Sequence, residues 1–374
     1  MKDASRIESH KMMFHPEWVA RWKEAMNDWE VAKKLYPLYI EATPTAACNH
    51  NCLFCAVDYI DKNPLFIDAD IFKKALADMA AGGVKSIMYA GEGEPTLHPK
   101  LDEIVLQTKN SGIDVAFTTN GSNLNERFLD KCLDKITWIK VSIDAGTKET
   151  HLRIHRPKNE NDWENIFNNL ETAVNLKKEK RNQCWLGAQS LLLPRGWDKD
   201  GSEIPSNEEE IAVLAEKLKS IGVDCLVVKP YSHQPLSETE IYKDISYGDY
   251  SKLSQDLEKI ADDNFEIVFR SHTMEKYSQD RSYHFCGAVP FAWAYIMGDG
   301  SVYSCSVYLL DEKFYLGNIN EQSFKEIWEG ERRKRHWEFM REFNPKNCRK
   351  NCRMDEVNKY LWGVSNAPYN VNFI

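Results

Sequence analysis

The sequence predicts an α/β protein with a parallel β-sheet, followed by a smaller second domain. Between residues 37 and 232, six short apolar segments alternate with helix-like segments, which is typical of a parallel sheet with helices packed outside it. The six segments are apolar on both faces, as expected for covered strands. After residue 232 the alternation ends. Open doubly wound sheets and barrels share this pattern, and both place ligands at the C-terminal ends of their strands.

The regular elements of the first part follow one another in a fixed rhythm. Asp68 is the expected N-cap of the helix that starts there, and Ser206 with Glu209 matches a capping box before the last helix, which Gly222 should end. The expected strands cover residues 37–43, 84–91, 113–121, 136–146, 184–194 and 223–231. The expected helices cover residues 15–36, 68–83, 99–112, 123–134, 162–180 and 206–222.

The last third of the chain is organised differently. A polar and aromatic stretch at residues 231–250 has no clear period and predicts a loop or lid. Asp299-Gly300 between alternating residues predicts a tight β-hairpin. A helix at 250–263, a strand at 265–271 and a helix at 323–340 complete the pattern. We therefore expect an N-terminal helical extension (1–36), a core domain (37–232), a linker or lid (233–285) and a small second domain (286–374).

Composition narrows the class of protein. The chain has 374 residues and a formal net charge of −9, so a nucleic-acid partner is not expected, because an acidic chain repels phosphate backbones. No apolar run approaches the roughly 20 residues that span a bilayer, and the first residues have no apolar signal region. We expect a cytoplasmic protein without a membrane partner.

Ten cysteines in a reducing compartment favour metal binding over disulfides. Cys132, Cys184 and Cys225 stand alone in apolar surroundings and are expected to be small buried residues. A first group, with the spacing C-x3-C-x2-C, directly follows the first strand: Cys48, Cys52 and Cys55. Zinc and cubane iron–sulfur sites both take four ligands, so three thiolates leave one position open. His50 is an alternative fourth ligand that would close a zinc site.

The segment around these cysteines resembles the radical S-adenosylmethionine (radical SAM) enzymes, whose C-x3-C-x2-C motif has an aromatic residue before its last cysteine. "AGEGEPTLHP" at 90–99 resembles the family's glycine–glutamate–proline segment, and "TTNG" and "KVSIDAG" end the third and fourth strands. The resemblance covers about residues 37–232 and implies a partial (β/α)6 TIM-like barrel. It implies these cofactor-binding residues: Phe54, Gly93, Glu94, Asn120, Ser142, Asp144, Arg156 (or Arg153), Gln189 and Val228.

The resemblance also implies the chemistry. Cys48, Cys52 and Cys55 would hold a 4Fe–4S cluster whose fourth iron binds the amino and carboxylate groups of S-adenosylmethionine. Glu94 would receive the methionine amino group, and Arg156 would pair with its carboxylate. One electron would cleave the sulfonium and release a 5′-deoxyadenosyl radical that abstracts hydrogen from the substrate.

A second group of cysteines forms a complete set of four: Cys286, Cys305, Cys348 and Cys352. Four thiolates close either a cubane cluster or a zinc site. The order of these cysteines, with "LGNINEQSFKEIWEG" between them, resembles the twitch domain, a shortened SPASM domain of the same family. This resemblance implies a small α+β domain with one fully ligated auxiliary 4Fe–4S cluster, which can accept an electron from a substrate radical.

These implications favour an oxidoreductase that dehydrogenates a small polar molecule, such as a sugar, nucleotide sugar, amino sugar or cyclitol. Flavodoxin or ferredoxin would supply electrons. Lys229 and His233, in and after the sixth strand, are the expected catalytic bases. Peptide or protein maturation, sugar epimerisation or elimination, and a non-enzymatic iron–sulfur or zinc protein remain as alternatives.

Overall fold

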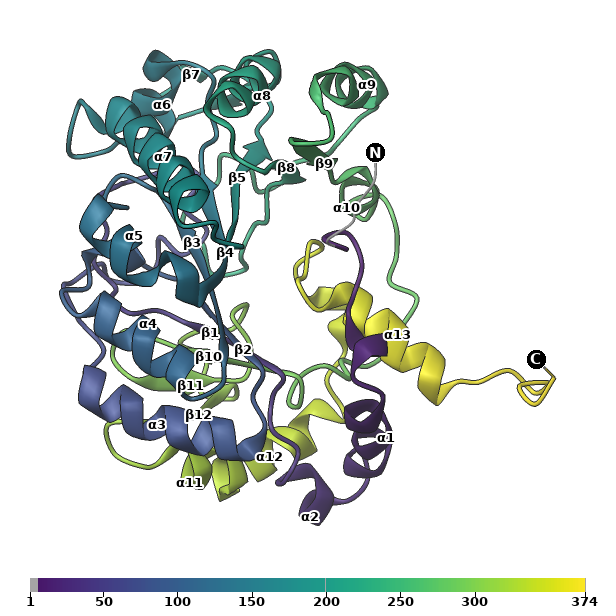
Figure 1. Ribbon diagram of the computed structural model, residues 1–374. Coiled ribbons are helices and arrows are strands. Elements are labelled where there is room, and N and C mark those ends of the chain that lie inside the picture. Colours follow the sequence, from purple (N-terminus) through teal and green to yellow (C-terminus); the bar gives the residue numbers. More distant parts are fainter. Residues whose placement is uncertain (1–5, 199, 374) are drawn as a thin grey trace.

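A computed structural model describes residues 6–198 and 200–373. One ten-stranded sheet, in the order β12-β11-β10-β1-β2-β3-β4-β5-β8-β9, curves through the molecule, and helices α3 to α8 cover its outer side (Figure 1). The strands are β1 Tyr39–Ala42, β2 Ser86–Tyr89, β3 Asp114–Thr119, β4 Ile136–Ser142, β5 Trp185–Leu192, β8 Cys225–Pro230, β9 Glu266–Phe269, β10 Trp293–Ile296, β11 Ser301–Tyr303 and β12 Tyr315–Asn318. The helices between them are α3 Ala69–Gly82, α4 Leu101–Asn110, α5 Glu126–Cys132, α6 Lys148–His155, α7 Asp162–Glu179 and α8 Glu210–Ile221.

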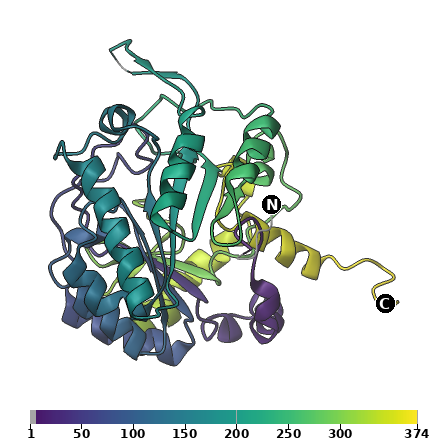
Figure 2. The same cartoon turned by 45° about the horizontal axis from the view of Figure 1, so that its top comes forward.

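The predicted α/β class with a mainly parallel sheet is confirmed. Each neighbour pair from β10 through β1 to β9 runs parallel. The hairpin at Asp299-Gly300 also forms, because β10 and β11 pair antiparallel around it. A separate two-stranded hairpin, β6 Gly196–Trp197 with β7 Glu203–Ile204, projects from the body in Figure 2. No helix in the described part of the chain combines the length and the apolar character that crossing a bilayer needs.

The two faces of the sheet have different environments. Alternate residues of β4, such as Ile139 and Val141, are buried in the main hydrophobic cluster beneath the helices. The residues at the other alternate positions, Trp138, Lys140 and Ser142, are half-buried on the opposite face. Because side chains alternate along a strand, this separates an outer, helix-covered face from what we call the inner face of the sheet.

The sheet crosses both predicted boundaries after the core. β9, from the expected linker, pairs with β8, and β10 from the expected second domain pairs with β1. The stretch at residues 231–250 contains no helix or strand, as predicted, and α9 Ser251–Ile260 and α10 Ser271–Glu275 follow. The four-part division of the chain therefore stays a prediction, although its parts share one sheet.

Several helix ends were predicted correctly and several were not. Asp68 accepts bonds from the amides of Asp70 and Ile71, and Gly222 ends α8 in the left-handed region at φ 91°. The expected capping box before α8 is absent, because Ser206 bonds to the amide of Glu208 and α8 begins at Glu210.

Two expected single helices are each broken into two shorter ones. The first is divided into α1 Pro16–Ala25 and α2 Trp29–Ala32, because Asp28 is extended and caps α2. The last is divided into α11 Phe324–Glu329 and α12 Glu331–Met340 by Gly330, which is also extended. The sequence did not predict α13 Asp355–Ser365.

A second hydrophobic cluster joins the two ends of the chain. Trp22 is fully buried and donates to the carbonyl of Gly287 at 2.8 Å, and Trp337 donates to the carbonyl of Ala25 at 3.1 Å. In Figure 1, α1 and α2 accordingly lie beside the C-terminal helices α12 and α13. The tail after α13 extends away from the body (Figures 1 and 2).

Candidate active site

The first cysteine group lies in the loop that follows β1, at the C-terminal edge of the parallel strands. Its three thiols are half-buried and free of disulfides. Burial raises the pKa of Cys48 to about 11 and that of Cys52 well above its usual range, and the neighbouring thiols of the group raise both further. The three thiols therefore act on one another electrostatically, as expected of thiols that would hold one metal cluster.

Backbone hydrogen bonds join the cysteine loop to the end of α6. The amide of Asn51 donates to the carbonyls of His155 and Arg156, at 3.1 and 3.2 Å, and the amide of Leu53 donates to the carbonyl of Ile154 at 2.9 Å. The ring of Phe54 packs edge-on against His155, with ring centres 5.2 Å apart. Phe54 therefore stabilises the loop against α6.

Glu94, in the loop after β2, connects this loop to the end of β3. One carboxylate oxygen accepts bonds from the Thr96 amide and hydroxyl, at 3.0 and 2.7 Å, and from the Thr119 hydroxyl at 2.6 Å. The other oxygen accepts a bond from the Asn120 amide at 2.7 Å. Glu94 is 3% exposed. It thus caps the short turn that follows it and also fixes the end of β3.

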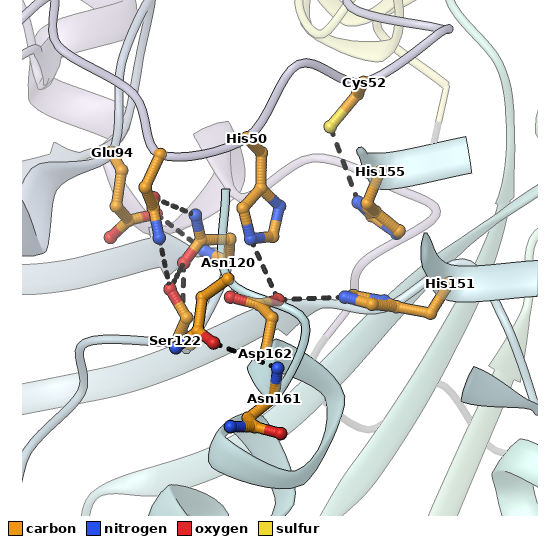
Figure 3. A network of polar contacts seen from close by, with 12 residues as sticks. His50, Cys52, Glu94, Asn120, Ser122, His151, His155, Asn161 and Asp162 are labelled. Atoms are coloured by element: carbon orange, nitrogen blue, oxygen red, sulfur yellow. Dashed lines mark hydrogen bonds and ion pairs between the residues drawn. The ribbon is translucent and has the colours of Figure 1, made fainter. Parts of the chain in front are cut away.

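Asn120 extends this network to the cysteine loop, as Figure 3 shows. Its side-chain amide donates to Asn49 at 2.8 Å, and its carbonyl oxygen accepts from the Ser122 hydroxyl at 2.9 Å. Asn49 in turn donates to Ser122 at 2.6 Å. Asn49 lies between Cys48 and His50 in the chain, so the network determines where the first cysteine sits relative to Glu94. The sequence did not single out Asn49 or Ser122.

Gly93 is required by a close approach of two backbone segments. A Cβ atom there would overlap the carbonyl oxygens of Thr45 and Ala47, just before Cys48. The adjacent amide of Glu94 donates to the Ala47 carbonyl at 2.8 Å. The glutamate segment therefore packs directly against the start of the cysteine loop.

Gly93→Ala is expected to push these two segments apart, because backbone atoms cannot yield as a flexible side chain does. We expect a loss of about 3 kcal/mol in stability and at least tenfold weaker S-adenosylmethionine binding, measured by urea unfolding and calorimetry. Gly363→Ala is the control, since a Cβ there meets nothing within 4 Å. Equal behaviour of the two variants would contradict the packing argument.

Three residues on the inner face form a chain of hydrogen bonds. The Lys229 ammonium donates to the Gln189 side-chain carbonyl at 2.8 Å, and the Gln189 amide donates to the Ser142 hydroxyl at 2.9 Å. Burial lowers the pKa of Lys229 to about 7. Asp144, just beyond β4, is 2% exposed and accepts a bond from the Leu191 amide at 2.5 Å, and burial raises its pKa to about 7.

The side chains of two residues predicted to bind the cofactor, Val228 and Arg156, lie outside the hydrogen-bond networks described above. Val228 is fully buried in the main hydrophobic cluster on the outer face, because the inner-face position of β8 belongs to Lys229. The guanidinium of Arg156 is 44% exposed and forms an ion pair with Asp198. Arg156 ends α6 in the left-handed region at φ 46°, and its carbonyl, as described above, contacts the cysteine loop. Its neighbour Arg153 is also exposed.

A buried histidine cluster beneath the cysteine loop was missed by the sequence analysis (Figure 3). His50 and His151 lie 3.0 and 2.9 Å from the same oxygen of Asp162. His155 lies 3.4 Å from the Cys52 sulfur through Nδ1. The i, i+4 spacing of His151 and His155 could have indicated this cluster, because it places both side chains on one face of a helix. The sequence did not predict a helix at these residues.

His155 has polar neighbours at both ring nitrogens. Its Nε2 lies 3.3 Å from the Asp144 amide nitrogen and 3.4 Å from an Asp144 carboxylate oxygen, and its Nδ1 contacts the Cys52 sulfur. Two overlapping sets of metal-ligating atoms occur here, His50–Cys52–His155 and His50–His151–Asp162, each within 4.8 Å. We interpret them as a hydrogen-bonded support for the loop.

The four cysteines of the second group meet in one apolar cavity. Cys286 precedes β10, Cys305 follows β11, and Cys348 and Cys352 lie in the loop between α12 and α13. The remaining lining is apolar or aromatic: Val289, Trp293, Tyr308, Phe314, Met340, Phe343 and Met354.

Hydrogen bonds to sulfur already exist in this cavity. The Asn358 side chain donates to Cys286 at 3.4 Å, and the Val307 amide donates to Cys305 at 3.4 Å. A hydrogen bond from the Cys348 thiol lowers the pKa of the Cys352 thiol. Convergent thiols with N–H donors in apolar surroundings suit an iron–sulfur cluster.

The loop after β8 bonds to both cysteine groups. Gln234 donates to the carbonyl of Ser306 at 3.1 Å, next to Cys305, and Thr239 donates to the carbonyl of Leu53 at 3.0 Å, between Cys52 and Cys55. Among the described residues, the buried Nδ1 of His233 in this loop has no hydrogen-bond partner. His233 therefore lies on a segment that spans the space between the two groups.

Comparisons with known proteins agree with this arrangement. Residues 43–187 match the radical SAM superfamily, and residues 286–353 match SPASM, an iron–sulfur cluster-binding domain. The two matches imply S-adenosylmethionine and a 4Fe–4S cluster in the first domain and auxiliary iron–sulfur chemistry in the second. The two cysteine groups lie inside the matched ranges.

Individual relatives differ in their reactions. The tungsten-containing aldehyde ferredoxin oxidoreductase cofactor-modifying protein of Pyrococcus furiosus is 25% identical over 79% of this chain and 81% of its own. An S-adenosylmethionine-dependent nucleotide dehydratase of Lacinutrix mariniflava is 32% identical over 61% of this chain, which spans only 46% of that relative. SuiB of Streptococcus suis, in complex with its precursor peptide SuiA, has the same fold, with a TM-score of 0.61 at 18% identity over 95% of this chain and 78% of its own.

Proposed function

Because the chain belongs to the radical SAM superfamily and carries a SPASM domain, we propose that this radical SAM enzyme is an oxidoreductase. Its substrate is a small polar molecule such as a sugar, nucleotide sugar, amino sugar or cyclitol. Flavodoxin or ferredoxin supplies the reducing electron. Free cysteines throughout the described chain suit a reducing compartment, and we expect the enzyme in the cytoplasm.

The residues of the first site fit the implied cofactor. Cys48, Cys52 and Cys55 would hold the cluster, and Gly93 and Glu94 would receive the methionine end of S-adenosylmethionine beside it. When bound, these groups supply the one-electron cleavage that yields a hydrogen-abstracting 5′-deoxyadenosyl radical. The chain's own residues position the loop: Asn120 bonds to Asn49, as described above, and His155 bonds to Cys52.

Lys229 is the proposed base. Its pKa of about 7 means that a substantial fraction is neutral near physiological pH, so its amine can take the hydroxyl proton after the hydrogen atom has left the carbon. The Gln189 carbonyl oxygen orients this amine from the neighbouring strand. His233 is a second candidate, since its buried Nδ1 has no hydrogen-bond partner in the described part of the chain.

The proposal of an oxidation rests on the four thiols of the second cysteine group. Loss of a hydrogen atom and a proton leaves one electron that must leave the substrate. Cys286, Cys305, Cys348 and Cys352 line one cavity and would fill all four ligand positions of a cluster. No position is left for substrate there, which favours electron acceptance over substrate binding. The loop after β8 joins this cavity to the first site.

The test uses Cys286→Ala/Cys305→Ala with candidate substrates deuterated at each ring carbon. The wild-type enzyme should transfer deuterium into 5′-deoxyadenosine and form a product three mass units lighter than the deuterated substrate, because one deuterium and one hydrogen are lost. The variant should still cleave S-adenosylmethionine but lose at least 99% of the oxidised product, because the second electron has no acceptor. A redox-neutral product from the wild type, or full oxidation by the variant, would exclude this function.

A further inference from the structure

The inner face of the sheet carries a lysine whose charge is not balanced. Lys140, in the middle of β4, has neither a hydrogen bond nor an ion pair among the described residues. Its ammonium lies over the rings of Trp138 and Trp185, 4.8 and 5.5 Å from their centres. The side chain is half-buried. A desolvated cation held only by aromatic faces can gain a strong contact from an anion.

A second cation reaches the same face from the C-terminal domain. Arg353 donates to the Tyr39 hydroxyl at 2.8 Å, and its side chain as a whole is 44% exposed. Its contact with Glu41 is loose, at 3.6 Å. Arg353 and the Thr118 hydroxyl both contact the Met88 sulfur, at 3.8 and 3.6 Å. Thr118 is paired in register with Lys140, so Arg353 and Lys140 flank one continuous surface.

The local charge is positive although the chain is acidic. Burial lowers the pKa of Lys140 to about 8; Cys225 raises it, and Arg353 and Arg270 lower it further. Burial likewise lowers the pKa of Lys229 most, Arg270, Arg353 and Lys140 lower it further, and Asp144 raises it. Arg270 has Glu8 3.9 Å away, whereas Lys140 has no carboxylate so close. A protein of net charge −9 thus concentrates cations where its inner face is accessible.

We propose that the inner face binds an anionic group of the substrate, a carboxylate or a phosphate, with Lys140 as its principal contact and Arg353 beside it. This inference rests on the proposed function, since it takes the inner face as the substrate side of the first site. It restricts the substrate class from small polar molecules to anionic ones.

The carboxylate of S-adenosylmethionine is a different anion, and position separates the two. Ser142 is the last residue of β4, and Glu94 bonds to Asn120 at the end of β3 and to Ala47 before the cysteine loop. Lys140 precedes Ser142 by two residues on the same face of β4, a distance of about 7 Å along the strand. The anion held by Lys140 therefore lies one layer further from the cysteine loop than the expected cofactor.

The test measures binding rather than turnover. Reconstituted protein with bound S-adenosylmethionine is titrated calorimetrically with pyrophosphate and with tricarballylate, and the tighter probe identifies a phosphate or a carboxylate. Lys140→Met keeps the stem packed between the tryptophans but removes the charge, and Lys140→Arg keeps the charge. Lys109→Met, at an ion pair with Asp114 outside the site, is the matched control.

Lys140→Met should weaken probe binding at least tenfold, while Lys140→Arg and Lys109→Met stay within threefold of wild type. Lys140→Met should keep its affinity for S-adenosylmethionine and its uncoupled cleavage within twofold. Undiminished probe binding by Lys140→Met, or no saturable binding of either probe to wild type, would overturn the proposal, as would loss of S-adenosylmethionine affinity in Lys140→Met. Failure of wild type to cleave S-adenosylmethionine would instead overturn the proposed function.

Discussion

Replacing Cys48, Cys52 and Cys55 together by alanine should abolish formation of 5′-deoxyadenosine from S-adenosylmethionine under anaerobic, dithionite-reduced conditions. The three thiols share one loop and act on one another electrostatically, and no other thiol is placed to replace them in the described structure. The variant should also lose about half of the bound iron, because the four-cysteine cavity keeps its own cluster. Iron analysis and product chromatography measure the two effects.

A matched control separates ligand loss from general damage. Cys132 is fully buried, solitary and distant in sequence from both groups, so Cys132→Ala should keep full iron content and cleavage at a modest cost in stability. If the triple variant still cleaved S-adenosylmethionine, or if it retained all iron while losing cleavage, the assignment of these thiols as cluster ligands would be wrong.

Arg333→Met should cost about 3–5 kcal/mol of stability, the largest expected effect outside the cysteine loops. Arg333 is fully buried and forms no ion pair with a carboxylate among the described residues, and burial lowers its pKa to about 9. Its guanidinium donates to the carbonyls of Ala32, Trp328, Leu35 and Pro290. Methionine fills part of the volume but leaves these buried acceptors without donors. Urea unfolding of the metal-free protein measures the change.

Arg332, the neighbour of Arg333 in the sequence, is the control for this loss of stability. Arg332 is 44% exposed and pairs with Glu312, and exposed pairs contribute little because water screens them. Arg332→Met should therefore change the unfolding free energy by less than about 1 kcal/mol. Similar losses in both variants would show that Arg333 does not hold the C-terminal helices against the N-terminal segment through its carbonyl contacts.

Most of the fold was predictable because its elements are local. The apolar segments before Cys48, Glu94 and Asn120 each became a strand of the parallel sheet, so these polar residues all lie at one edge. The helix breaks at Asp28 and Gly330 were not predicted, because an extended residue inside an apolar-periodic stretch leaves the period almost unchanged. The sheet membership of β9 and β10 was not predicted either, since pairing partners are distant in sequence.

In the candidate active site too, some features were predictable from the sequence and others were not. Glu94 and Gly93 were identified from a motif, and the structure adds the reason for each: four donors to one carboxylate, and a backbone approach that excludes a Cβ. Val228 and Arg156 stay predictions. The sequence did not reveal that the Val228 side chain packs on the outer face, because a strand that is apolar on both faces does not show which parity points inward. Nor did it reveal that Arg156 pairs with Asp198, which is distant in sequence.

The sequence by itself determined that three thiols follow a strand within eight residues and that helices and strands alternate, because both depend on spacing along the chain. Only the tertiary structure decided that His155 contacts Cys52 and that Lys140 shares the inner face with Arg353. These encounters depend on how distant segments pack, and packing follows from the burial of whole surfaces rather than from any local pattern.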